Sequence, residues 1–118
     1  MCTRVDLALT QRRGDNLTRQ ISVCTNLHRQ NQHTILAICD IDLLGKTIEE
    51  GEIVFKVNKD FYDGTRISIE EAFDLIEKST IINMIGRKIV GTAVEYGLVH
   101  ADAVLEICGI PHAQIVKM

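Results

Sequence analysis

The sequence predicts an α+β fold in a single domain, built as a mostly antiparallel sheet with two helices packed on it. Three observations lead to this class. Short segments rich in β-branched residues alternate with turn residues through the first half of the chain. Apolar residues then recur at helical spacing between residues 68 and 97, and two short strand-like segments end the chain. The length of 118 residues suits one domain with a sizeable core.

The first half of the chain predicts strands joined by turns. We expect strands at residues 4–10, 20–28, 33–40 and 52–58. The segment 4–10 alternates polar and apolar side chains, which indicates one buried face, and a turn at residues 11–16 follows it. Residues 29–32 lie between two of these strands and predict a hairpin, and an Asp-Gly turn at the end of residues 59–64 closes the last strand.

Two helices are expected next. Ser68 stands three residues before Glu71, which is the spacing of a capping box, and the apolar stripe that follows predicts a helix over residues 68–79. Residues 80–97 predict a second helix whose apolar positions cover more than one face, so we expect it to be largely buried and to end at Gly97. Segments 103–109 and 113–118 predict the last two strands.

Two glycines fall inside the second predicted helix. Gly86 and Gly91 each destabilise a helix interior by about 1 kcal/mol relative to alanine. A helix keeps such residues where something approaches its backbone closely. The approaching group is either the sheet or a ligand that lies along the helix face with Asn83 and Arg87, which would be one turn apart.

The composition is that of an ordinary soluble protein, with 46% hydrophobic and 25% charged residues. No apolar run approaches the roughly 20 residues that a membrane span needs, and the start of the chain is unlike a secretory signal, so we expect a cytoplasmic protein without a membrane partner. Residues 1–33 carry five arginines against two aspartates, a charge of +3, whereas residues 34–118 carry eight basic and fourteen acidic side chains, a charge of −6. The basic front end indicates either a local contact with a polyanion or a solvated surface.

Two familiar site types are excluded by spacing. The four cysteines, Cys2, Cys24, Cys39 and Cys108, lie far apart without a Cys-x-x-Cys pair, so we expect reduced and mostly buried apolar side chains. The Gly45-Lys46 pair resembles the end of a phosphate loop, but that loop needs a glycine where Asp40 stands. Lys46 is therefore either an exposed charge after a turn or a local anion contact. No cofactor is indicated.

Two histidines near the predicted hairpin are candidate metal ligands. If Gln30 and Asn31 form the tip of the hairpin, His28 faces His33 with Cβ atoms roughly 5 Å apart. Two imidazoles at that separation could share a divalent metal ion, with His112 as a third ligand. The alternative is an exposed cross-strand pair that needs no metal.

The end of the chain contains the sole proline beside a histidine. Pro111 fixes its own φ and Gly109 permits a sharp turn, so we expect a stiff corner that presents His112 and Gln114 on one side of an extended segment. Such a corner suits either a site with His112 as general base or a hairpin locked by a hydrogen bond from the imidazole to a backbone carbonyl.

Four motifs, taken in order, resemble an archaeal family of small uncharacterised proteins, domain of unknown function 424. They are CDIDLLGKTIEEGE, DFYDG, IINMIGRKIVGTAVEYGLV and GIPHAQ. The similarity covers about residues 21–118, which we take as the domain, and residues 1–20 look like an N-terminal extension. The family's pattern falls on Leu44 to Lys46, Phe61, Tyr62, Gly64, Asn83, Gly86 and Pro111 to Gln114. The resemblance implies an archaeal cytoplasmic protein of unassigned activity.

The motif residues suggest a polar cleft. If Lys46, Tyr62, Asn83, His112 and Gln114 converge, they supply hydrogen-bond donors, one cation and one base, without a carboxylate pair or a nucleophile. This set favours a non-enzymatic binding module that serves RNA or a translation-apparatus protein through Lys46, Arg87 and the front arginines. One alternative is a small enzyme with His112 as general base and Lys46 holding an anionic substrate. Another is a homodimer in which the second helix supports the interface.

Overall fold

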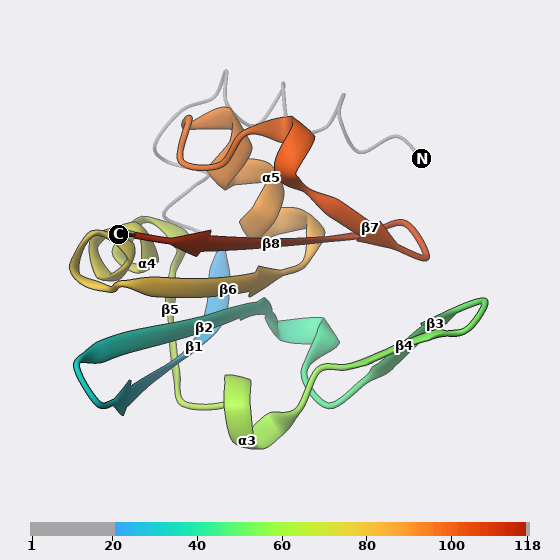
Figure 1. Cartoon of the computed structure of the whole chain (residues 1–118), viewed down its shortest axis with the longest axis horizontal. Helices are drawn as coiled ribbons and strands as arrows, with labels where there is room; N and C mark the ends of the chain where they lie inside the picture. Colours follow the sequence, from blue (N-terminus) through green and yellow to red (C-terminus); the bar gives the residue numbers. More distant parts are fainter. Residues whose placement is uncertain (1–20, 118) are drawn as a thin grey trace.

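A computed structural model describes residues 21–117 and confirms the α+β prediction (Figure 1). The predicted strand at 4–10, the turn at 11–16 and the last residue of segment 113–118 lie outside the described residues. The main sheet consists of β1 (Ser22–Gln30), β2 (His33–Asp40), β5 (Thr65–Ser68), β6 (Ile81–Ile85), β7 (Leu105–Ile107) and β8 (Ile110–Val116). Its order is β5-β1-β2-β6-β8-β7, and β2 and β6 run parallel while every other neighbouring pair is antiparallel.

The remaining elements cover the two faces of this sheet. They are the 3-10 turns η1 (Ile41–Leu43) and η2 (Ala101–Ala103), the hairpin of β3 (Thr47–Glu50) and β4 (Ile53–Lys56), and the helices α3 (Lys59–Tyr62), α4 (Ile69–Lys78) and α5 (Arg87–Glu95). In Figure 1, α5 lies above the strands and α3 below them, and the β3–β4 hairpin extends to the right. No helix in the described part of the chain has the length and apolar character that a membrane crossing requires.

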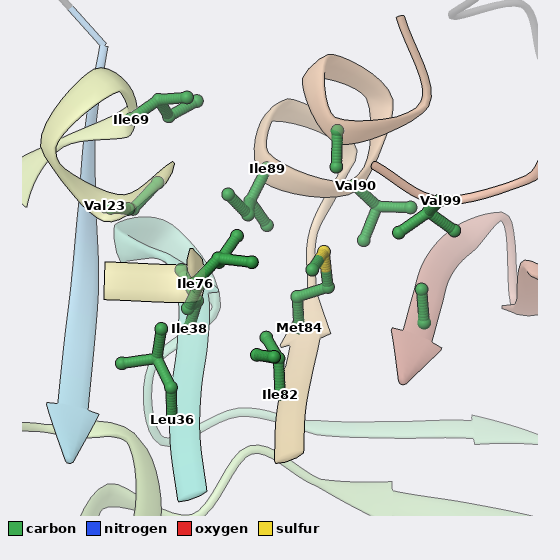
Figure 2. Packing of buried hydrophobic residues seen from close by; sticks show 13 residues of the cluster. Val23, Leu36, Ile38, Ile69, Ile76, Ile82, Met84, Ile89, Val90 and Val99 are labelled. Carbon is green, nitrogen blue, oxygen red and sulfur yellow. The ribbon is translucent and has the colours of Figure 1, made fainter. Parts of the chain in front are cut away.

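The larger core cluster lies between the sheet and the two longer helices (Figure 2). Alternate residues of the central strands, such as Leu36 and Ile38 in β2 and Ile82 and Met84 in β6, point toward α4 and α5. The predicted capping box is confirmed, because the Ser68 side chain accepts from the Glu71 N–H while the Glu71 carboxylate accepts from the Ser68 N–H.

A second core cluster lies on the opposite face of the sheet. It consists of Cys24, Ala37, Cys39, Leu43, Ile48, Val57, Tyr62, Ile85 and Ile107. Cys24 and Cys39 are buried register partners and both are free thiols, as expected, whereas Cys108 is exposed. Burial raises the pKa of Cys39 to about 12, so this thiol stays protonated at neutral pH.

The prediction of one helix over residues 80–97 is wrong in its first half. Residues Ile81–Ile85 form the central strand β6, and α5 begins only at Arg87. A central strand is buried on both faces, so its continuous apolar run has the same appearance as a buried helix. Asn83 and Arg87 therefore do not share a helix face, and Gly86 stands at the start of a helix rather than inside one. Gly97 does follow the helix in a left-handed conformation, with φ +78°.

The hairpin after β1 is confirmed, but its predicted register is wrong by one residue in each strand. Asn31 and Gln32 form the two-residue turn, so Gln30 pairs with His33 and His28 pairs with Ile35. The reason is the backbone of Asn31, which adopts φ +58°, a left-handed conformation that asparagine tolerates at the first turn position.

Pro111 lies inside β8 rather than at a corner, because the tight turn falls on Cys108 and Gly109, with φ +54° and +78°. Pro111 faces Gly86, whose N–H donates to the Pro111 carbonyl at 3.0 Å. The Gly86 carbonyl accepts from the Val90 N–H in the first turn of α5. The N–H that proline lacks would have pointed at a carbonyl already engaged, so proline weakens the ladder little at this position.

Candidate functional site

Three of the predicted site residues share one face of the sheet. Asn83 in β6 and Gln114 in β8 are register partners, and His112 lies two residues before Gln114 on the same side of β8. This is the face that carries the second core cluster. Asn83 and His112 are half-buried and Gln114 is exposed, so the three polar side chains form a continuous strip across the β6–β8 pair.

His112 lies at the better covered end of this strip. Its ring packs against Phe55 of β4, with ring centroids 5.1 Å apart and an angle of 56° between the planes. Burial lowers the pKa of His112, which favours the neutral imidazole near neutral pH. Within residues 21–117 the structure shows no hydrogen bond or ion pair to the ring, so the imidazole does not lock the β7–β8 hairpin through a described backbone carbonyl.

The carboxyl ends of the parallel strands β2 and β6 meet at a buried carboxylate that the sequence did not single out as a site. Asp40, only 4% exposed, ends β2 and accepts from the backbone N–H groups of Lys88 at 2.9 Å and Ile89 at 3.0 Å. It therefore caps α5 from another strand. Burial raises the pKa of Asp40, while these two hydrogen bonds act in the opposite direction.

Gly86 is required beside this carboxylate. Its φ of +129° is a conformation that side chains rarely adopt, and a Cβ at this position would lie 2.6 Å from both Asp40 carboxylate oxygens. The close approach that the sequence predicted at this glycine is thus made by Asp40 at the end of β2, which agrees with the alternative that the sheet approaches the backbone.

Charged side chains of both signs line a hollow of about 120 Å³ at the same end of the sheet. The hollow is lined by Asp40, Asp42, Leu43, Arg87, Lys88 and Ile110. A Cβ placed on Gly109 would lie 3.7 Å from Nη2 of Arg87, which locates that guanidinium over the β7–β8 turn. The N–H of Lys46 donates to the carbonyl of Leu43, so Lys46 begins directly beside the hollow. We call Lys46, Arg87 and Lys88, all exposed, the basic rim.

Tyr62 lies apart from the other predicted residues. It ends α3, is only 3% exposed and belongs to the second core cluster, and burial raises its pKa to about 12. Its ring packs edge-on against Phe61, with centroids 5.0 Å apart. Tyr62 therefore supports the core beneath η1 and is not on the surface that the other five residues occupy.

His28 and His33, the alternative metal ligands predicted from the sequence, do not face each other across the hairpin. Nε2 of His28 lies 2.9 Å from the Phe61 carbonyl, and its ring stacks on that of Phe61 with centroids 4.9 Å apart. His33 contacts the Thr80 hydroxyl instead, at 3.4 Å. Within residues 21–117 no group of three or more histidine, cysteine or acidic side chains is placed to hold a metal ion.

The structure thus brings five of the six predicted binding residues to one region, in two parts. Asn83, His112 and Gln114 form the polar strip, and Lys46 and Arg87 belong to the basic rim at the end of β6. Sequence reasoning missed Lys88 and the Asp40–Gly86 contact. The available signal was Asp40 itself, a carboxylate at the end of an apolar strand. The Lys88 N–H that it accepts lies 48 residues later, so the sequence does not show which helix it caps.

Comparison with known proteins agrees with the motif resemblance. Residues 28–118 match the family model described as "Protein of unknown function (DUF424)". The chain is similar to a crystal structure of an uncharacterized conserved protein from Methanopyrus kandleri, at 27% sequence identity and a TM-score of 0.70. That match covers 82% of this chain and 94% of the other. A search of curated proteins found no match.

Proposed function

The chain belongs to this family of proteins of unknown function, so its role has to be inferred from its own surface, and we propose that it is a non-enzymatic module that binds single-stranded RNA at the basic rim. One observation carries the proposal. Two cations, Arg87 and Lys88, line one hollow together with Asp40 and Asp42. Lys46, from a segment far away in the sequence, starts beside it, because its N–H donates to the carbonyl of Leu43, another lining residue. None of the three forms an ion pair with another residue of the described chain.

The hollow suits a phosphate and not a base. Its volume of about 120 Å³ is small, its two lining cations are exposed, and of its two carboxylates Asp40 is buried and Asp42 is exposed. Because Asp40 already accepts the free N–H groups of α5, binding would rest on the side-chain cations rather than on the helix terminus. Contacts of this kind fix the position of a nucleic acid backbone without reading its sequence.

The polar strip extends the rim with uncharged groups. His112 is the register partner of Ile85, the residue before Gly86, so the strip begins where the rim ends. The side-chain amides of Asn83 and Gln114 both donate and accept hydrogen bonds, which fits the edges of unpaired bases and the 2′-hydroxyl. The rim and strip together offer a path from phosphate contacts to base contacts.

The geometry gives less support to a small enzyme that uses His112 as general base. The lowered pKa of the imidazole would suit a base, but no described side chain is hydrogen-bonded to the ring to orient it. Its contact with Phe55 further restricts access from the hairpin side. The homodimer remains a separate hypothesis that the mass in solution tests, since one chain has a mass of 13.2 kDa.

The test is binding of the full chain to total cellular RNA, titrated against salt. The Lys46→Ala/Arg87→Ala variant removes two rim charges, and a matched control, Arg66→Ala/Lys78→Ala, removes two exposed charges from β5 and the end of α4. For single strands each lost phosphate contact lowers the slope of log K against log salt by about 0.7, so we expect a loss of about 1.4 in the rim variant alone. Absence of binding at low salt, or equal loss in the control, contradicts the proposal.

A further inference from the structure

The strand β1 extends beyond its outer neighbour at the edge of the sheet. Its residues run from Ser22 to Gln30, but β5 pairs only with the first four of them, up to Thr25. In a hairpin with a two-residue turn the flanking pair, here Gln30 and His33, is hydrogen-bonded, and such pairs alternate along the ladder. The backbone groups of Leu27 and Arg29 therefore point outward, and within residues 21–117 they have no partner.

A hollow of about 320 Å³ opens beside this free edge, on the face that carries α4. It is lined by Thr25, Asn26, Leu27, Leu36, Thr65, Ile67 and Leu75. Four of these side chains are branched aliphatic groups from β1, β2, β5 and α4, and Leu27 is 42% exposed. The hollow thus combines an apolar wall with the place where the next strand of the sheet would run.

One unpaired cation lies next to the hollow. Arg29 is exposed and, two residues after Leu27, lies on the same face of β1. Within the described part of the chain its guanidinium forms no ion pair. A ligand that fills the hollow and continues along β1 therefore meets a positive charge two residues further on.

We propose that this edge is a binding site for an extended peptide segment of a partner protein, which adds to the sheet beside β1. The peptide backbone pairs with the N–H and C=O groups of Leu27 and Arg29, as in other cases of strand addition. A large apolar side chain of the peptide enters the hollow, and an acidic side chain two positions away faces Arg29.

A second copy of this chain fits the edge less well. In antiparallel pairing of two copies of β1, Arg29 would face a residue of the same segment, and Ser22–Gln30 contains no aspartate or glutamate. The unpaired cation therefore selects an acidic partner peptide. This site lies on the opposite side of the sheet order from β8 and does not depend on RNA binding at the basic rim.

The test uses the uniformly 15N-labelled full chain and the blocked peptide Thr-Ile-Thr-Leu-Thr-Glu-Thr, read out by amide hydrogen exchange. At nine-tenths saturation we expect about tenfold slower exchange of the Leu27 and Arg29 N–H groups. The outward N–H groups of Gln114 and Val116, on the free part of the β8 edge, serve as an internal control and should not change.

Three changes separate the parts of the site. A peptide with Ser in place of Leu should bind about thirtyfold more weakly, because the side chain no longer fills the hollow. The Arg29→Gln variant should bind the original peptide about fivefold more weakly than the unaltered protein does. A peptide with Gln in place of Glu should bind the variant and the unaltered protein with equal affinity. A peptide N-methylated at alternate residues should not bind.

Three results would overturn the proposal. One is unchanged exchange of Leu27 and Arg29 at millimolar peptide. Another is equal protection of Gln114 and Val116, which would indicate unspecific pairing with any free edge. The third is undiminished binding of the N-methylated peptide, which would exclude strand addition.

Discussion

Replacing Gly86 with alanine should destabilise the protein through two effects, strain of the backbone and loss of the Asp40 cap on α5. The φ of +129° is nearly restricted to glycine, and holding an alanine there costs about 1–3 kcal/mol. The new Cβ would also lie 2.6 Å from both carboxylate oxygens, so Asp40 must leave the Lys88 and Ile89 N–H groups. Losing such a cap costs about 0.5–2 kcal/mol, which brings the expected total to roughly 1.5–5 kcal/mol.

A double-mutant cycle that combines Gly86→Ala with Asp40→Ala isolates the free energy of the Asp40 cap. Asp40→Ala alone removes the cap, and Gly86→Ala in that background should cost only the backbone strain, because no carboxylate remains to be displaced. The double variant should therefore be about as unstable as Gly86→Ala alone. The two single effects should exceed the double effect by about 0.5–2 kcal/mol, the free energy of one cap.

The assay is urea denaturation followed by circular dichroism, with free energies compared at unchanged m. Gly51→Ala is the matched control, since Gly51 also has a positive φ, +62°, but a Cβ there would meet nothing within 4 Å. The cost of Gly51→Ala should stay at about 1–2 kcal/mol, which is the cost of a left-handed backbone. Additivity of the two substitutions within about 0.5 kcal/mol, or a Gly86→Ala cost no larger than that of Gly51→Ala, would refute the reasoning.

Three further predictions concern local contacts. Ser68→Ala removes the capping box of α4 and should lower the free energy of unfolding by about 1 kcal/mol in urea, whereas Ser22→Ala, outside any cap, should change it little. Thr80→Val leaves the Thr34 N–H without its acceptor at 2.9 Å and should cost about 1–3 kcal/mol, with faster exchange of that amide as the diagnostic sign. Because burial lowers the pKa of His112, the unfolded chain binds a proton more readily than the folded chain between the two pKa values. The contribution of His112 to the free energy of unfolding should therefore fall as the pH drops through and below 6.5. His112→Phe should remove this part of the pH dependence in thermal melts, and an unchanged profile would contradict the assignment.

The parts of the fold that were predictable are those in which local signals suffice. The α4 capping box and its apolar stripe depend on residues within one turn of each other, and the Asn31 hairpin depends on one turn. The strand β6 was not predictable in this way, because Ile81–Ile85 acquires its state from β2 and β8 on either side. A helix over residues 80–97 would place Asn83 and Arg87 one turn apart, whereas they lie in a strand and in the following helix.

The candidate site shows the same division. His112 and Gln114 alternate along one extended segment, so their shared face could be predicted from sequence alone. Their proximity to Asn83 depends on the register of β6 against β8, and the capping of α5 by Asp40 depends on the parallel pairing of β2 and β6. Such non-local contacts leave no periodic trace in the sequence.

The parallel ladder between β2 and β6 also divides the chain in two. Every other strand pair of the main sheet lies wholly within residues 21–79 or wholly within residues 80–117. Each half can thus form its three-stranded unit from its own residues, and the parallel ladder between β2 and β6 is the strand pairing that joins the two units. The protein is therefore suited to fragment complementation, in which two separately produced pieces, cut between Ser79 and Thr80, reassemble along a single pair of strands.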